Sequence, residues 1–248
     1  MAITPGKNPY SLSIRIFSDG FSLFVHDENK ALLSVKHLQT RETEAEARFA
    51  ELLTQRELKG TFNQTRVIIE TGLYTLIPDH FSNDSRSMLA LQHPYLSDDY
   101  PVIENQIDGH GMTVVFATEP GLLKALRMAF PEIIPQLHLN TFLRTTPESA
   151  RVILWVRGGE IDLLLYDQDQ WMLMNSFNIT STEDIIYYTM NLFREFGLNR
   201  NEFALWAFIP ENAAQGFVSY TDLSAGLKPF FGNINNKLQT TWYEDYQW

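Results

Sequence analysis

Cysteine is absent from this chain of 248 residues. Its absence excludes thiol catalysis, disulfide bonds and cysteine-ligated zinc or iron–sulfur sites. Basic residues are also scarce: 19 Lys and Arg stand against 30 Asp and Glu, which gives a formal net charge of −11. We therefore expect no nucleic-acid partner, because nonspecific binding to phosphates relies on Lys and Arg.

Long hydrophobic runs are missing as well. No stretch approaches the roughly 18 uncharged apolar residues that a membrane-spanning helix needs. The first 13 residues, MAITPGKNPYSLS, hold no apolar core of signal-peptide length. Together with the lack of cysteine, which suits a reducing compartment, these absences predict a cytoplasmic protein without membrane insertion.

Several catalytic motifs do not occur in the sequence. There is no Walker A phosphate loop, no dinucleotide-binding Gly-x-Gly-x-x-Gly and no Gly-x-Ser-x-Gly nucleophile. One group of residues could form a metal site if the hairpin brings its ends together, and it comprises Asp98, Asp99, Asp108 and His110. Its spacing matches no common ligand set, so two polar turns are the favoured interpretation and no metal is expected.

What the chain does contain is one strand–turn–strand pattern that occurs twice. Residues 12–27, LSIRIFSDGFSLFVHD, alternate apolar and polar positions around an Asp-Gly turn, which is typical of a β-hairpin. A shift of 140 residues brings up a similar pattern in residues 152–167, VILWVRGGEIDLLLYD.

The segments that follow each hairpin also correspond. Each copy continues with a third strand, an amphipathic helix and a fourth strand, predicted at residues 31–38, 42–58 and 66–70 and again at 171–179, 181–197 and 202–210. Ser181 and Thr182 are alternative caps of the second helix. The shared order, rather than the few identical residues, indicates a duplication. A coincidence between two common α/β patterns is the alternative.

We therefore predict an α/β fold with duplicated βββαβ units in two lobes, residues 1–150 and 151–248. The first lobe includes an additional crossover region, residues 81–150. We expect this region to hold a hairpin that turns at residues 108–111, a short helix capped by Thr118, and a strand at residues 135–143.

This layout resembles the actin-like ATPase superfamily, whose duplicated fold is ribonuclease H-like. The superfamily includes sugar kinases, chaperones and the cytoplasmic scaffolds of pilus and secretion systems. Three segments, LSIRIFSDGFSLFVHD, FNQTRVIIETGLYTLIPDHF and LKPFFGNINN, also resemble a domain-of-unknown-function family of Bacteroidetes proteins with this fold. The resemblance covers nearly the whole chain. It implies a bacterial protein and an actin-like fold, but no activity.

The superfamily supplies a test of phosphate chemistry, because each hairpin turn of its active members reads roughly Asp-x-Gly-(Thr/Ser). The Asp organises a magnesium ion, the glycine admits phosphates to backbone amides, and the hydroxyl donates to them. In the first turn here, Ser18 stands in place of that Asp and Phe21 in place of the hydroxyl. In the second, Arg157 replaces the Asp, and Glu160 puts a negative charge where a phosphate would lie. A standard ATPase or kinase is therefore not expected, and ATP with magnesium is disfavoured as a cofactor.

The two turns still supply candidate ligand-binding residues, which are Ser18, Asp19, Gly20, Arg157, Gly158 and Gly159. One interpretation is that the Arg157 guanidinium and the two following amides hold an anion. The other, which we favour, is that Gly158 and Gly159 form an ordinary tight turn and Arg157 is solvated.

The sequence thus predicts a catalytically degenerate actin-like protein that acts as a binding or scaffold module for another protein. The alternative is a nucleotide-binding enzyme, a divergent ATPase or kinase with a non-standard phosphate site. The aromatic tail TTWYEDYQW, residues 240–248, either packs on the body of the protein or binds a partner.

Overall fold

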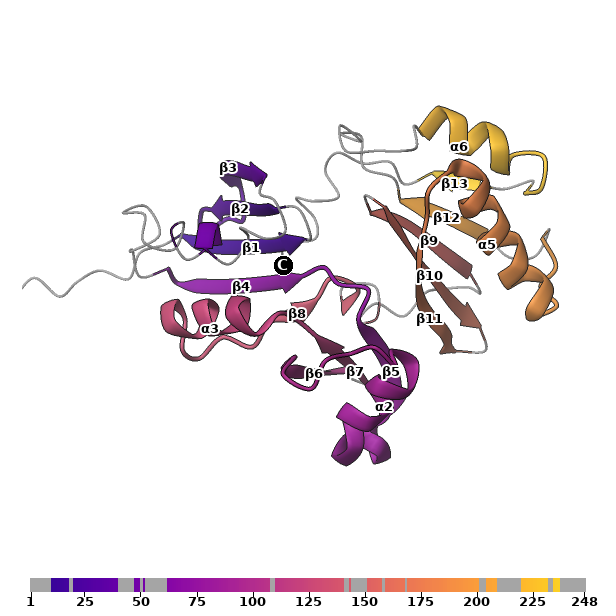
Figure 1. The fold of residues 1–248 in the computed structure, drawn as a ribbon. Helices are drawn as coiled ribbons and strands as arrows, with labels where there is room; N and C mark the ends of the chain where they lie inside the picture. Colours follow the sequence, from indigo (N-terminus) through magenta and orange to yellow (C-terminus); the bar gives the residue numbers. More distant parts are fainter. Residues whose placement is uncertain are drawn as a thin grey trace, which may run out of the picture. The chain divides into compact units, whose positions relative to one another are not determined.

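A computed structural model gives the fold of the chain (Figure 1). It describes residues 10–17, 20–39, 47–49, 51, 62–107, 110–140, 143, 151–157, 159–167, 169–200, 204–208, 220–231 and 234–236. The chain divides into two compact units, one formed mainly by Met1–Thr141 and the other by Phe142–Tyr246. Within the described residues, no helix is long and apolar enough to cross a membrane.

The first unit is built on a five-stranded sheet. In spatial order its strands are β3 (Leu32–Gln39), β2 (Gly20–His26), β1 (Ser11–Phe17), β4 (Gln64–Ile69) and β8 (Gln136–Leu137). The first three strands form an antiparallel meander, and β4 and β8 run parallel to β1. The alternation of Leu12, Ile14 and Ile16 buries these three side chains on one face of β1, as the period of a strand requires.

The second unit is built on a sheet of the same order and strand directions. Its strands are β11 (Gln170–Asn178), β10 (Glu160–Asp167), β9 (Arg151–Arg157), β12 (Ala204–Phe208) and β13 (Ile234–Asn236). Helices α5 (Thr182–Glu195) and α6 (Tyr220–Leu227) lie on one side of this sheet (Figure 1). Val152, Leu154 and Val156 of β9 pack there in one core with Ile185 of α5 and Leu223 of α6.

The predicted βββαβ order is therefore present in both units, and the predicted α/β fold class is confirmed. In the first unit the helix predicted at residues 42–58 is described only at Ala47, Arg48, Phe49 and Glu51, which are helical. The rest of it lies outside the described residues. Phe49 is fully buried, and its ring centroid lies 4.8 Å from that of Phe21 in β2.

In the sequence, the segment between β4 and β8 forms a third, three-stranded sheet. In spatial order its strands are β5 (Tyr74–Pro78), β7 (Met112–Ala117) and β6 (Val102–Ile107). The region also holds the 3-10 helix η3 (Asp79–Asp84) and helices α2 (Ser85–Gln92) and α3 (Pro120–Ala129). The predicted hairpin is confirmed as β6–β7, while Asp108 and Gly109 of its turn lie outside the described residues.

Two details of the sequence prediction in this region are wrong. The strand expected at residues 135–143 pairs only at Gln136–Leu137, because its partner β4 ends at Ile69. The N-cap of α3 is Glu119 rather than Thr118, and no side-chain hydrogen bond caps that helix. The apolar segment after β4 was not assigned from the sequence, and it forms β5 in the three-stranded sheet.

Helix α5 begins and ends as its sequence predicts. Ser181 is the N-cap, and its hydroxyl accepts a hydrogen bond from the Asp184 backbone amide while the Asp184 carboxylate accepts from the Ser181 amide. This capping box decides between the two predicted caps in favour of Ser181. Gly197, with φ of 62°, follows the last turn in the left-handed conformation that glycine adopts without strain.

Candidate functional site

The structure describes three of the six residues predicted to bind a ligand. Gly20 begins β2 in the first unit, whereas Arg157 ends β9 and Gly159 lies in the following turn in the second unit. Ser18, Asp19 and Gly158 lie outside the described residues.

Arg157 is held by acidic and hydroxyl side chains of its own sheet. Its Nε donates to Oδ2 of Asp162 at 2.5 Å, and its Nη2 donates to Oδ1 of the same carboxylate at 3.1 Å. The same Nη2 lies 3.2 Å from Oγ of Ser176 and 2.9 Å from Oε2 of Glu160. The side chain of Arg157 is only 8% exposed and that of Asp162 is fully buried. The interpretation of Arg157 as a solvated side chain is therefore wrong.

The register of the hairpin explains this arrangement. Arg157 is paired with Glu160 across the β9–β10 turn, and Asp162 is two residues further along β10. Because side chains alternate along a strand, Glu160 and Asp162 both lie on the face of the sheet that carries Arg157. The sequence contains this signal, which a comparison of turn positions alone did not use.

The charges of this cluster, defined as Arg157, Glu160, Asp162 and Ser176, oppose an added anion. One guanidinium faces two carboxylates, so the acidic groups of the cluster outnumber its cation. The bidentate contact with Asp162 uses the fork of Arg157 that would otherwise grip a phosphate. An incoming phosphate would have to displace a buried carboxylate, which leaves that carboxylate without its charge partner.

The two described glycines of the turns have different surroundings. A Cβ atom added to Gly20 would lie 2.2 Å from the backbone oxygen of Leu38 and 3.0 Å from Cε2 of Phe17. A Cβ atom added to Gly159 would meet only the backbone oxygen of Ile179, at 3.9 Å. Gly20 therefore permits the close approach of β3 to β2, whereas Gly159 has room for a Cβ atom.

A second buried ion pair lies in the first unit, where the parallel strands β1 and β4 end. Glu70 directly follows β4, and its carboxylate accepts a hydrogen bond from Nε of Arg15 in β1. The side chains are 11% and 7% exposed for Arg15 and Glu70 respectively. Open α/β sheets place ligands at this edge. The Glu70 carboxylate is thus already paired with a cation of its own sheet. The sequence alone did not predict this ion pair.

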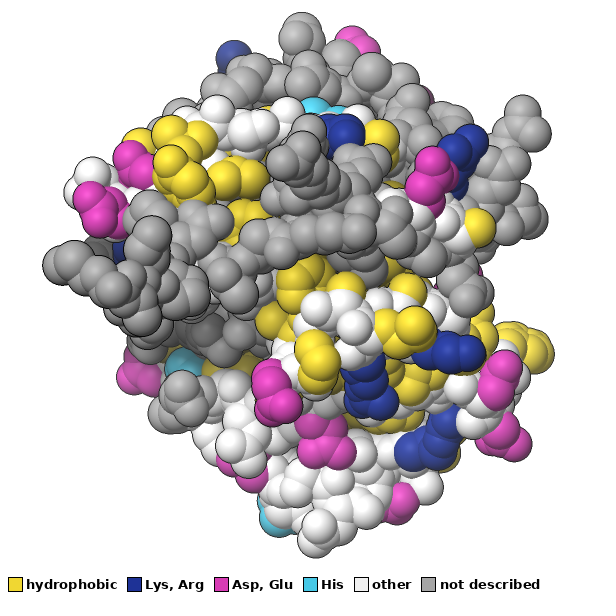
Figure 2. All heavy atoms as spheres, turned by 90° about the vertical axis from the view of Figure 1, so that its left-hand side faces the viewer, with side chains coloured by type: hydrophobic (Ala, Val, Ile, Leu, Met, Phe, Trp, Pro, Cys, Tyr) yellow, Lys and Arg dark blue, Asp and Glu magenta, His cyan; other side chains and the backbone are white. Residues whose placement is uncertain are grey.

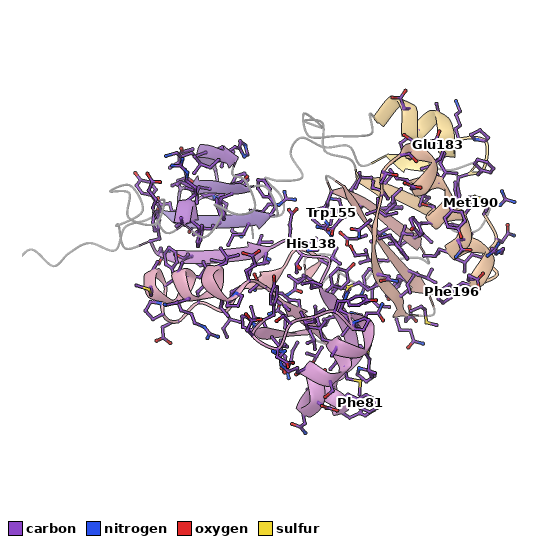
Figure 3. All side chains as sticks on the ribbon, viewed as in Figure 1. Phe81, His138, Trp155, Glu183, Met190 and Phe196 are labelled. Carbon is purple, nitrogen blue, oxygen red and sulfur yellow. The ribbon has the colours of Figure 1, made fainter. Side chains whose placement is uncertain are left out.

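Buried amides connect β8 to the inserted sheet near the same edge. Asn105 of β6 accepts hydrogen bonds from the Leu137 amide at 2.9 Å and from Nδ2 of Asn140 at 2.8 Å, and it donates to the Pro135 oxygen at 3.1 Å. The His138 ring, labelled in Figure 3, meets the Tyr74 ring edge-on with centroids 6.0 Å apart. These contacts fix the two sheets to one another, and none of the side chains that make them is acidic.

The face of the second sheet that carries Arg157 continues with aromatic residues. Tyr166 is 1% exposed, and its ring centroid lies 5.1 Å from that of Trp171. Burial raises the pKa of Tyr166, the nearby Asp169 raises it further, and Arg151 opposes both. The phenol therefore stays neutral around neutral pH, and it supplies no base.

Metal ligands do not gather anywhere in the described part of the chain. No group of three or more His, Asp or Glu residues there could hold a metal ion. Of the cluster considered from the sequence, Asp108 lies outside the described residues.

Comparisons with solved structures identify the fold. A Bacteroides thetaiotaomicron protein with an actin-like ATPase fold and unknown function is 19% identical, with a TM-score of 0.83 over 99% of this chain and 98% of that one. PilM, from the PilM–PilN type IV pilus biogenesis complex, is 14% identical, with a TM-score of 0.57 over 94% of this chain and 89% of PilM. At these identities the likeness shows the fold alone.

Comparison at the level of sequence gives the family. No curated protein matches the chain. A family model described as "Protein of unknown function (DUF3822)" matches residues 3–215. The resemblance to a domain-of-unknown-function family with an actin-like fold is thus confirmed, and the chain belongs to the DUF3822 family.

Proposed function

We propose that this chain is a catalytically degenerate actin-like protein of the cytoplasm that binds another protein as a scaffold or adaptor. One observation carries the proposal: the guanidinium at the second hairpin turn is bound by Asp162 and Glu160 of its own hairpin. The fold resemblance implies that a magnesium-organising Asp stands at the position of Arg157 in active relatives. Here the Arg157 guanidinium, bound to two carboxylates, occupies the position of that Asp.

The Arg15–Glu70 pair supports the proposal in the first unit. A carboxylate that organises a metal or activates water must be free to bind it, and Glu70 is instead buried against Arg15. Both units therefore use their charged groups at these strand ends to hold the sheet together. The equal strand order of the two sheets is accounted for by an internal duplication, after which each copy lost its phosphate contacts.

A protein partner is supported by the complex described for PilM. PilM shares the fold, and it is described in a complex with PilN. The net charge of −11 disfavours nucleic acid as the partner. A protein is therefore the partner class that we propose.

The alternative is a nucleotide-binding enzyme, a divergent ATPase or kinase. Thermal unfolding with ATP and magnesium separates the two functions. A ligand present at 100 times its dissociation constant stabilises the native state by about 2.7 kcal/mol, which gives a measurable rise in Tm. The proposal expects no rise beyond that in magnesium chloride alone. A clear rise that requires ATP and magnesium together would overturn the proposal in favour of the enzyme.

A further inference from the structure

A groove runs along α3 in the first unit, between that helix and the segment that leads into β6. It has a volume of about 410 Å³. Its apolar lining comes from Pro101, Leu123 and Met128, and its charged lining from Lys124, Arg127 and Asp99. All of these residues belong to one unit, so the groove does not depend on the placement of the other.

The wall opposite α3 is held in place by Arg86. Its Nη2 donates to the backbone oxygens of Asp98 at 2.5 Å and Tyr100 at 2.7 Å. The Thr118 amide, close to the start of α3, donates to the Pro101 oxygen at 3.4 Å. These bonds tie the Asp98–Pro101 segment to α2 and α3, so the groove exists before any partner arrives.

The helical wall presents apolar and basic groups together. Leu122, Leu123 and Leu126 are buried in the protein, which leaves Lys124, Arg127 and Met128 on the exposed side of α3. Met128 is 77% exposed, although a thioether side chain gains free energy when it is buried against a partner. Figure 2, which faces the first unit, shows hydrophobic and basic side chains side by side on its lower half.

The two cations of the groove are available to a partner. Among the described residues, neither Lys124 nor Arg127 has an ion-pair or hydrogen-bond partner for its side chain. They are separated by three positions and so lie on one side of the helix. In a chain of net charge −11 they form a local positive site.

A second groove, along the C-terminal half of α5, offers less. It is lined by Tyr187, Met190, Leu198 and Arg194, among others. Arg194 already donates to Asn191 at 2.5 Å and to Glu195 at 2.9 Å. Figure 3 labels Glu183, Met190 and Phe196 along this helix. Of the two arginines that line it, Arg194 is thus already bound within its own helix, so this groove offers only Arg200 where the α3 groove offers two cations.

We propose that the α3 groove binds a short segment of a partner protein that carries a large apolar side chain next to Asp or Glu. The apolar side chain packs on Met128 and Pro101, and the carboxylates pair with Lys124 and Arg127. This inference rests on the proposed binding function and specifies the chemistry of the partner.

A library of random twelve-residue peptides displayed on phage tests the inference against the immobilised full chain. Selected peptides are then labelled, and their affinity is measured by fluorescence anisotropy. We expect them to share an acidic residue beside a large apolar one. The double variant Lys124→Glu/Arg127→Glu should weaken binding by about tenfold or more, since it reverses both charges. Met128→Ala should weaken binding by a smaller factor.

Lys228→Glu, an exposed charge reversal in the second unit, is the matched control and should leave the affinity unchanged. Thermal unfolding of each variant checks that the fold is kept. Failure to select binders, or binders that are indifferent to the α3 variants, would overturn the inference. A concentration-dependent dimer that the double variant abolishes would overturn it too, because the occupant would then be a second copy. None of these outcomes involves ATP, so failure of the groove and failure of the proposed function are separate results.

Discussion

At the scale of single residues, the Arg157 cluster determines what the second hairpin turn can do. A buried ion pair is weak evidence for stability, but removing one partner strands the other charge in a low dielectric. Asp162 is fully buried, so its charge depends on Arg157. The cluster therefore gives a structural reason for an arginine at a turn where active relatives place an acid.

Replacing Arg157 by Ala should lower the free energy of unfolding by about 3–5 kcal/mol, because the buried Asp162 carboxylate then loses two hydrogen bonds from a cation. Urea unfolding measures this change. Arg48→Ala is the control: Arg48 and Glu51 form an ion pair whose side chains are 60% and 65% exposed, and its loss should cost less than about 1 kcal/mol.

A paired variant tests the cause of that loss. Arg157→Met combined with Asp162→Leu removes both charges and should recover much of the stability that Arg157→Ala loses. Equal losses in the single and the paired variant would show that packing, and not the stranded carboxylate, is responsible.

The two turn glycines supply a second prediction. Gly20→Ala should destabilise the protein by about 1–3 kcal/mol, since the new methyl group would overlap the Leu38 carbonyl oxygen. Gly159→Ala should be close to neutral, because its new methyl group has nothing nearer than 3.9 Å. Urea unfolding of both proteins gives the comparison, and equal losses would contradict this distinction.

At the scale of elements, α5 shows how local sequence fixes the start of a helix. Asp184 accepts hydrogen bonds from the backbone amides of Thr180 and Ser181 and from the Thr180 hydroxyl. Hydrogen bonds to Thr180, with a smaller contribution from Ser181, lower the pKa of Asp184 below its ordinary value of 3.8. The charged carboxylate is therefore part of the cap.

Removing the cap should weaken the second unit in a pH-dependent way. Ser181→Ala should cost about 1 kcal/mol at neutral pH. Because the folded-state pKa of Asp184 is depressed, its contribution is complete above the unfolded-state value and is lost as the pH falls through the folded-state value. Asp184→Asn should therefore be less stable than the wild type at neutral pH, with the difference shrinking as the pH falls below 3.8. Urea unfolding across this range measures it, and a constant difference would contradict the charged cap.

The elements with regular patterns were predictable from the sequence. The hairpins follow from alternating apolar residues around short turns, and α5 follows from its cap and its terminal glycine. The short β8 and the separate β5 were not predictable, because both depend on which distant strand supplies hydrogen bonds. Thr118 resembles a cap, yet Glu119 is the N-cap and Pro120 begins the helix.

The candidate site was predictable only in part, for a related reason. Comparing turn residues was enough to predict that Arg157 and Glu160 depart from a phosphate loop. The contact with Asp162 required the strand register as well, and the Arg15–Glu70 pair required knowledge that β1 and β4 are parallel neighbours. Such long-range pairings are not encoded in any one segment.

At the scale of the whole molecule, the strand order indicates an actin-like protein, whereas the charged residues at the strand ends do not indicate phosphate chemistry. Both sheets have the strand order of an actin-like protein, while the strand ends carry ion pairs internal to each sheet. A fold does not by itself imply an activity, since function depends on the site. The α3 groove, with its free cations and exposed methionine, offers a contact surface that needs no nucleotide.

Titration calorimetry of the full chain with ATP and magnesium tests the central claim most directly. We predict no saturable heat, and the same result for Arg157→Ala, because Asp162 and Glu160 already bind the Arg157 guanidinium. Saturable binding of about one ATP per chain, weakened or lost in Arg157→Ala, would contradict the account and identify the second turn as a working nucleotide site.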